Sequence, residues 1–323
     1  MPKVTVIVPA YNAEPYIEQC TKSLLAQTLE DIELIFINDG STDKTPQIIE
    51  RLIQGHENAH LFNQENKGLY KTREIGLAKA TGEYVGWCDA DDFVEPQMYE
   101  KLYEAAIKND SEMSYCDYSW FPEKIKTKEK WFREYQGKVD VNFVERNSQP
   151  WNKIVKRELL QRLEIGKHFV SCFDEIYIEV LLTAKNPVAV KEKLYNYRVS
   201  SSSMSVSYTN VSHYARFIKA SEELKKVVHP IIRDNKYWSD YFEYRIIYYT
   251  LMTMLVAANA GDRKSYDNTK YDLNETHKQY KKNMHYWSIL KSNFGVLKSI
   301  GITSCSCSYG WARLLAHISF GYR

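Results

Sequence analysis

The chain has 323 residues, which is enough for one large domain and a smaller one. Its hydrophobic share of 44% and aromatic share of 14% exclude an intrinsically disordered protein. The net charge is only +2, but it is unevenly spread: residues 206–323 hold 17 Lys/Arg and 9 Asp/Glu, and residues 1–205 hold 26 and 32. The first part of the chain is therefore acidic and the second part basic.

Three features of the chain bear on its compartment. The first residues, MPKVTVIVPAYN, enter a strand pattern directly and contain no signal peptide. The longest uncharged apolar run, residues 246–260, is short for a membrane span. Four of the six cysteines stand singly in apolar settings, which is typical of reduced thiols, and Cys305-Ser-Cys307 lacks the second pair that would complete a metal site. We therefore expect a cytoplasmic protein.

Strand and helix patterns alternate along the first 118 residues. Apolar runs rich in β-branched residues predict strands, and apolar residues at helical spacing predict the helices between them. The predicted strands are 3–9, 32–37, 60–63, 83–88 and 111–118, and the predicted helices are 15–28, 69–80, 96–108 and one that begins near Lys44 after a cap by Thr42 or Asp43. This alternation, with short links, predicts a doubly wound α/β sheet that is mostly parallel.

The chain changes character after this alternation. Residues 119–148 are charged and irregular. They are followed by a helical pattern in 173–184 and a strand pattern in 194–199. From about residue 206 the pattern is mainly helical, with many aromatic and basic residues. We therefore expect two domains, 1–205 and 206–323.

Polar motifs follow three of the predicted strands: PAYN, NDGSTD and DADD. Ligands of open α/β sheets bind beyond the carboxyl ends of the strands, so we expect the three motifs to share one edge. In the third motif Asp89, Asp91 and Asp92 lie within four residues, and like charges that close need a positive partner. Asp89-Ala90-Asp91 matches a DxD motif, whose carboxylates can hold Mg²⁺ or Mn²⁺ together with substrate phosphates. The alternative is an acidic cluster at the start of a helix near Pro96.

Four other residues near this edge have two interpretations each. Asp39 could cap the turn that follows it or accept a hydrogen bond from a nucleotide base. Tyr11 could stack on that base or pack on the edge of the sheet. Lys67 and Arg73 offer positive charge either to a diphosphate or to the acidic cluster.

Together these motifs resemble the family 2 glycosyltransferases, a large inverting group with the GT-A fold. The resemblance is carried by VTVIVPAYNAEPYI, ELIFINDGSTDKT and NKGLYKTREIGLAKATGEYVGWCDADD, and it continues through WNKIVKREL, FDEIYIEVLL and LYNYRVSSSSMS. It covers most of residues 3–205. It implies an α/β GT-A domain, whereas the mainly helical region after residue 206 has no family-wide counterpart.

The resemblance also implies a donor site and a metal site. The candidate nucleotide-sugar-binding residues are Pro9, Tyr11, Asp39, Lys67, Arg73, Asp89, Ala90, Asp91 and Arg198. Pro9, Tyr11 and Asp39 would contact the base, which is usually uracil. Asp91, together with Asp89, would ligate Mn²⁺ or Mg²⁺, and Arg198 would belong to a loop that closes over the diphosphate.

The acceptor side is implied by a later stretch. Trp151, Asn152 and Lys153 resemble the acceptor-side stretch of the family. An inverting transfer needs a carboxylate that takes the proton of the acceptor hydroxyl. The family usually has Glu-Asp, whereas the order here is Asp174-Glu175. Alignment puts Glu175 in the position of the base, with Asp174 as the alternative base or as a helix N-cap.

These features predict an inverting, metal-dependent glycosyltransferase that moves a sugar from a nucleotide-sugar, usually a UDP-sugar, to a saccharide hydroxyl. The implied setting is bacterial surface polysaccharide synthesis, with a saccharide, lipid-linked or polymeric acceptor. A nucleotidyltransferase is disfavoured because no Gly-rich loop with Arg and Lys follows the first strand. A sugar-nucleotide-binding scaffold without catalysis remains an alternative. No nucleic-acid recognition motif is present in the sequence.

The end of the chain is basic and aromatic. Residues 276–323 contain seven cations, eight aromatic residues and no acidic residue. Such a segment can lie on the inner face of the cell membrane, form a helical cap on the first domain, or contact a second copy of the chain.

Overall fold

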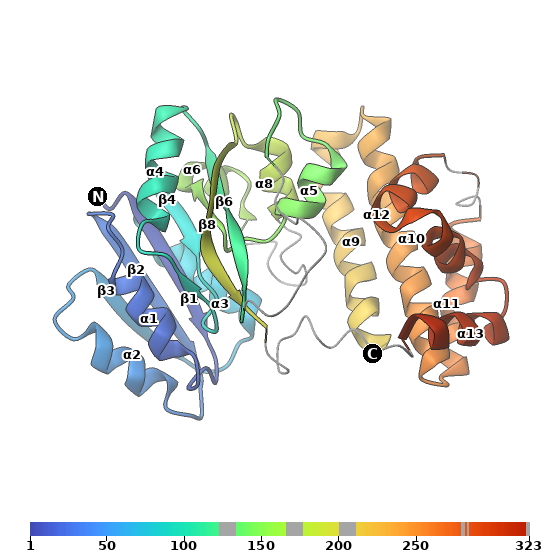
Figure 1. Ribbon diagram of the computed structural model, residues 1–323, viewed down its shortest axis with the longest axis horizontal. Helices are drawn as coiled ribbons and strands as arrows, with labels where there is room; N and C mark the ends of the chain where they lie inside the picture. Colours follow the sequence, from blue (N-terminus) through green and yellow to red (C-terminus); the bar gives the residue numbers. More distant parts are fainter. Residues whose placement is uncertain (123–133, 166–176, 200–210, 279–281, 283, 321–323) are drawn as a thin grey trace. The chain divides into compact units, whose positions relative to one another are not determined.

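The computed structural model describes residues 1–122, 134–165, 177–199, 211–278, 282 and 284–320 (Figure 1). The chain divides into two compact units, Met1–Ser200 and Ser201–Arg323. Three residues of interest lie outside the described residues: the candidate bases Asp174 and Glu175, and one of the six cysteines, Cys172.

The first unit contains one mixed sheet of eight strands in the order β3-β2-β1-β4-β7-β6-β8-β5. The strands are β1 (Val4–Ala10), β2 (Ile32–Asp39), β3 (Ala59–Gln64), β4 (Tyr84–Trp87), β5 (Phe93–Val94), β6 (Met113–Phe121), β7 (Lys153–Lys156) and β8 (Val188–Arg198). The first four strands in the sheet are parallel, and beyond them β7 and β5 run antiparallel to their neighbours. Strands β6 and β8 pair in parallel, and both run in the direction of the first four strands. The predicted α/β fold with a mostly parallel sheet is therefore confirmed, with β7 and β5 as the described strands that run the other way.

Helices cover both faces of this sheet (Figure 1). They are α1 (Ile17–Leu25), α2 (Thr45–Ile53), α3 (Leu69–Lys79), α4 (Met98–Lys108), α5 (Val141–Asn147), α6 (Arg157–Arg162) and α8 (Tyr177–Thr183). All seven residues of β1 are buried, as expected for a strand with helices on both sides. Its side chains alternate: Val6 joins the core cluster that contains Cys20 of α1 and Leu102 of α4, whereas Ile7 faces α3.

A glycine sets the distance between α3 and the sheet. A Cβ added at Gly76 would collide with the Cγ2 atom of Ile7 and would also contact Ile37. The absence of a side chain at Gly76 therefore lets α3 lie close against β1 and β2. This matters for the site because α3 carries Arg73.

The second unit is helical, as the sequence predicts. It consists of α9 (Val211–Ile232), α10 (Lys236–Asn259), α11 (Arg263–Thr276), α12 (Met284–Ser304) and α13 (Tyr309–Phe320). Helix α10 packs against the other four helices, and its Tyr241, Ile247, Leu251 and Met254 are fully buried. No described helix is long and apolar enough to cross a membrane.

The described cysteines are all free thiols. Cys20, Cys88, Cys116 and Cys305 are buried, and Cys307 is exposed. The sulfur atoms of Cys20 and Cys88 lie 3.8 Å apart beneath the acidic motif.

Candidate active site

The three polar motifs share one edge of the sheet. Strands β2, β1 and β4 are adjacent and parallel, with Ala10 opposite Asn38 and Ile7 opposite Trp87. The motifs PAYN, NDGSTD and DADD therefore lie side by side at the carboxyl ends of these strands. Pro9 is buried in β1, and Tyr11, just beyond the strand, is 53% exposed.

The first two motif loops are tied to one another. Asn12 Oδ1 accepts a hydrogen bond from the backbone N–H of Thr42 (2.8 Å), and Asn12 N–H donates to Ser41 Oγ (3.0 Å). One residue further, Ala13 N–H donates to Thr45 Oγ1 (2.8 Å). Asn12 adopts a left-handed φ of 47°, a conformation that asparagine tolerates better than most residues. These bonds give the edge a fixed shape, and the motif spacing alone did not reveal them.

Asp39 is a buried structural acceptor, with 3% exposure. Its carboxylate accepts hydrogen bonds from the backbone N–H groups of Lys67 (2.8 Å) and Gly68 (2.9 Å) and from Gln64 Nε2 (2.7 Å). It therefore orders the loop that leads into α3. The turn after β2 is instead capped by Asn38, whose Oδ1 accepts from Ser41 N–H (3.1 Å). The side chain of Lys67 is exposed.

Arg73 supplies positive charge to the acidic motif. This side chain, on α3, is 1% exposed, and its Nη2 atom lies 3.0 Å from Asp89 Oδ1. The guanidinium carbon lies 5.9 Å from the centre of the Trp87 ring. The sequence placed Arg73 near either a diphosphate or the acidic cluster, and the structure shows the contact with the cluster.

Asp92 is buried, with 1% exposure, and its carboxylate accepts two hydrogen bonds from residues of β8. Tyr195 OH donates to Asp92 Oδ2 (2.6 Å), and the backbone N–H of Arg198 donates to Oδ1 (2.6 Å). Burial, followed by the charges of Asp91 and Asp89, raises the pKa of Asp92 well above its ordinary value. Because α4 begins only at Met98, the acidic motif does not form the first turn of that helix.

Arg198, the last residue of β8, contacts the same acidic motif. Its Nε donates to the backbone carbonyl of Asp91 (2.7 Å), and its Nη2 donates to Gln19 Oε1 (2.7 Å). The guanidinium carbon also lies 4.7 Å from the centre of the Phe121 ring and 5.1 Å from that of Tyr16. Arg198 is thus positioned beside the DxD motif by polar and aromatic contacts together.

Asp89 and Asp91 suit part of a divalent metal site. Burial raises the pKa of Asp91, and the charge of Arg198 opposes this rise. A cation would favour the ionised form of such a carboxylate. Among the described residues no group of three or more His, Cys, Asp or Glu side chains converges. Two carboxylates still fit Mg²⁺ or Mn²⁺, because such ions commonly take remaining oxygen ligands from water and substrate phosphates.

The stretch Trp151–Lys153 is buried. Trp151 stacks on Tyr195, with ring centres 4.4 Å apart, and Lys153 Nζ donates to Asn152 Oδ1 (2.6 Å) and to the carbonyl of Gln149. Asn152 and Lys153 have no exposed surface, and Trp151 has 6%. In this structure the stretch therefore supports β7 and β8, and its acceptor role stays a prediction.

The helix that follows the candidate bases is fixed to β4. Tyr177, two residues after Glu175, receives a hydrogen bond from the indole N–H of Trp87, which lies two residues before Asp89. Glu179, in the next turn, is 5% exposed, and burial raises its pKa to about 7. Glu179 is not among the site residues predicted from the sequence, although it lies four residues after Glu175 in a predicted helix.

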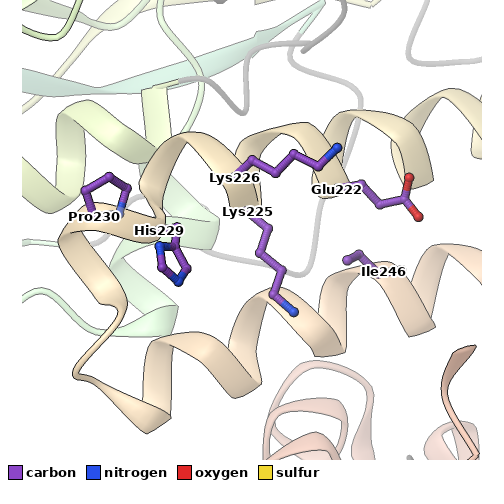
Figure 2. A pocket seen from close by; sticks show the side chains of 6 residues that line it. All are labelled: Glu222, Lys225, Lys226, His229, Pro230 and Ile246. Atoms are coloured by element: carbon purple, nitrogen blue, oxygen red, sulfur yellow. The ribbon is translucent and has the colours of Figure 1, made fainter.

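A separate hollow lies in the helical unit between α9 and α10 (Figure 2). It has a volume of about 670 Å³ and is lined by Glu222, Lys225, Lys226, His229, Pro230 and Ile246. It contains none of the residues that the sequence singled out. Glu222 lies three and four residues before the two lysines on α9, at the spacing at which opposite charges on a helix attract one another.

Comparison with known proteins identifies the family. The profile described as Glycosyl transferase family 2 matches residues 5–175, more than half of the chain. The chain therefore belongs to glycosyl transferase family 2. The uncharacterized glycosyltransferase EpsJ of Bacillus subtilis is 41% identical over 118 residues, which are 36% of this chain and 34% of EpsJ. Matches to the first curated relatives span 34% to 64% of their length.

Two solved structures share the fold. The structure of S. aureus TarS 1–349 in complex with UDP-GlcNAc has a TM-score of 0.71 and 19% identity, and the match covers 99% of this chain and 93% of that one. The mannosyltransferase PcManGT from Pyrobaculum calidifontis, in complex with GDP-Man and Mn²⁺, has a TM-score of 0.51 and 17% identity, with coverage of 98% and 86%. These matches confirm the GT-A fold.

Proposed function

We propose that this protein is an inverting, metal-dependent glycosyltransferase that moves a sugar from a nucleotide-sugar to a saccharide hydroxyl. The observation that carries the proposal is the edge where β2, β1 and β4 end. There the DxD carboxylates lie beside Arg73 and Arg198. A nucleoside diphosphate and a divalent cation together would complete the charge balance of this edge.

The base of the nucleotide would bind near Pro9, Tyr11 and Asp39. The exposed ring of Tyr11 is available for stacking on a planar base. The carboxylate of Asp39 has about four acceptor positions and uses three of them on Gln64 of β3 and on the loop before α3, so one more N–H could bond to it. UDP is the proposed nucleotide because the TarS structure contains UDP-GlcNAc.

The diphosphate would bind between the acidic motif and the basic side chains. Asp91 and Asp89 would hold Mn²⁺ or Mg²⁺, which stabilises negative charge on the leaving diphosphate. PcManGT, which has the same fold, contains Mn²⁺ with its nucleotide-sugar. Arg198 and the exposed Lys67 would contribute positive charge, and the backbone of Ala90 would line the site between the two ligands.

The acceptor hydroxyl needs a base. We assign this role to Glu175, with Asp174 as the alternative. The carboxylate takes the hydroxyl proton while the acceptor oxygen bonds to the anomeric carbon and the bond from that carbon to the diphosphate breaks, which inverts the centre. The family match extends to residue 175, and the anchoring of Tyr177 beside Trp87 supports the assignment.

The acceptor itself is proposed from the family alone. It would be a saccharide, free, lipid-linked or polymeric, used in cell-surface polysaccharide synthesis, with Trp151, Asn152 and Lys153 supporting its side of the site. A sugar-nucleotide-binding scaffold without catalysis is the second candidate.

The test is release of nucleoside diphosphate from a panel of UDP-, GDP-, CMP- and dTDP-sugars, with saccharide acceptors and Mn²⁺. One donor should be turned over, and Glu175→Gln should lower its kcat by at least about 100-fold while KM for the donor changes little. The exposed Glu104→Gln on α4 is the matched control and should behave as wild type. Tight donor binding without turnover by any variant would favour the scaffold instead.

A further inference from the structure

Exposed apolar side chains are concentrated at the end of the helical unit. Ten large hydrophobic side chains are exposed among the described residues, and five of them fall between residues 296 and 314. They are Val296 (56%), Leu297 (86%), Ile300 (52%), Trp311 (43%) and Leu314 (50%). Single exposed hydrophobic residues are ordinary, but a cluster of this kind marks an interaction surface.

These five side chains form one surface. Val296, Leu297 and Ile300 share a face of α12 by helical spacing, and Ser304 follows one turn later on that face. The indole N–H of Trp311 donates to Ser304 Oγ (2.9 Å), which joins α13 to this face. Leu314 lies one turn after Trp311. We call these five residues the α12–α13 surface.

A hollow opens into this surface. It has a volume of about 640 Å³ and is lined by Trp287, Ser288, Lys291, Val296 and Ile300. Val296 and Ile300 belong both to the hollow and to the α12–α13 surface. The hollow therefore offers apolar walls with one ammonium group, which suits an acyl chain near its anionic headgroup.

The described charged side chains of α12 and α13 themselves have a single sign. Lys298 and Arg313 are exposed on the same two helices, as is His317. No acidic residue follows Glu275 in the sequence. A partner that satisfies both features must be apolar and negatively charged.

A second copy of the chain fits this surface poorly. A two-fold dimer would place the patch against itself, so that Lys298 and Arg313 would lie near the cations of the other copy with no carboxylate of α12 or α13 to offset them. An anionic bilayer offers acyl chains for Leu297 and phosphates for the cations. The ring of Trp311, apolar with a bonded N–H, suits the boundary between headgroups and acyl chains.

We propose that the α12–α13 surface binds the surface of an anionic phospholipid bilayer, with the two helices lying in its interface. This attachment does not depend on sugar transfer. It would hold the protein where acceptors attached to lipids are found.

The experiment is flotation of the full chain with vesicles of phosphatidylcholine alone or mixed with phosphatidylglycerol. Wild type should bind the mixed vesicles and not the neutral ones, and added salt should weaken the binding. Leu297→Glu should lower the partition coefficient at least about tenfold, because burial of one leucine contributes that much. Lys291→Gln with Lys298→Gln should lower it by roughly fivefold for each charge removed.

Two controls keep the result interpretable. Leu297 is 86% exposed, so its substitution should leave the thermal midpoint unchanged. Tyr271→Glu changes an apolar side chain of α11 that is 67% exposed, and this variant should bind vesicles as wild type does. Brominated phosphatidylglycerol should quench tryptophan fluorescence in wild type, and less so in Trp311→Phe.

Three results would overturn the proposal: no binding to anionic vesicles, equal binding by Leu297→Glu, or a dimer in solution that Leu297→Glu separates while vesicles fail to bind. The last result would assign the surface to a second copy of the chain.

Discussion

At the scale of single residues, the structure shows how Asp89, Asp91 and Asp92 can lie within four positions of the chain despite their like charges. Arg73 pairs with Asp89, and Asp92 is held by Tyr195 and by the backbone of Arg198. Asp91 keeps a raised pKa because it is largely buried. The protein therefore supplies partners to Asp89 and Asp92 itself, and Asp91, together with Asp89, fits a cation that would arrive with the substrate.

The Arg73–Asp89 pair should matter for stability. Arg73→Met removes the guanidinium while keeping part of its packing, and it should lower the free energy of unfolding by about 2–3 kcal/mol, because Arg73 is buried and leaves a half-buried carboxylate behind. The control is Lys71→Met in the exposed pair Lys71–Glu74, which should change stability by less than about 0.5 kcal/mol. Urea unfolding measures both. Equal losses in the two variants would show that the Arg73–Asp89 pair has no special weight.

Glu179 should make stability depend on pH. Its pKa is about 7 in the folded chain against an ordinary 4.5, so between these values the folded state binds more protons than the unfolded state. Its contribution is fully favourable below pH 4.5, is lost as the pH rises to 7, and stays lost above that. Relative to wild type, Glu179→Gln should therefore gain stability as the pH rises from 5 to 8.

Urea unfolding of both proteins at four pH values isolates this effect, because other groups titrate in both. A difference between wild type and Glu179→Gln that stays constant with pH would show that Glu179 keeps an ordinary pKa in the folded chain.

At the scale of elements, the sequence predicted the helices and strands whose positions are set by a local pattern of apolar residues. The buried strands β1, β2 and β4 and the helices after them lie within a few residues of their predicted positions, because continuous apolar runs and helical spacing specify them. Strand β5 was missed because it has only two residues. Strand β8 begins at Val188, six residues before the prediction, because the charged residues 191–193 concealed its pairing with β6.

Contacts between elements were less predictable. Asp39 was predicted to be a site residue, and that role stays a prediction. Its partners Lys67 and Gly68 lie 28 and 29 residues away, and no local pattern connects them. The burial of Asn152 and Lys153 was likewise hidden, because amide and lysine side chains usually suggest surface positions.

The close packing of α3 on the sheet should leave no room for a side chain at Gly76. Gly76→Ala places a methyl group against Ile7 and should lower stability by about 1–3 kcal/mol. It should also weaken nucleotide binding, because α3 carries Arg73. Gly301→Ala in α12 is the matched change: its Cβ would meet Leu315 at an ordinary 3.8 Å, and it should raise stability by about 0.5–1 kcal/mol. Thermal unfolding compares them, and a stabilising Gly76→Ala would disprove the close approach.

At the scale of the whole molecule, the chain combines an acidic α/β unit with a basic helical unit. The charge and the change of pattern in the sequence predicted two domains, 1–205 and 206–323. The sequence also predicted that three polar motifs share one edge of the sheet, where the structure brings them together. It left the purpose of the helical unit open among three alternatives, because exposure is a property of the folded surface. The α12–α13 surface now gives one of these alternatives a defined set of residues.

The most direct test of the central claim is calorimetric titration of UDP into the protein with Mn²⁺ and with a chelator. We expect UDP to bind with Mn²⁺, and we expect its affinity to fall at least about tenfold in the chelator and in Asp91→Asn, whereas Glu104→Gln should bind as wild type. Equal affinity with and without metal, unchanged in Asp91→Asn, would contradict a metal-assisted diphosphate site at this edge of the sheet.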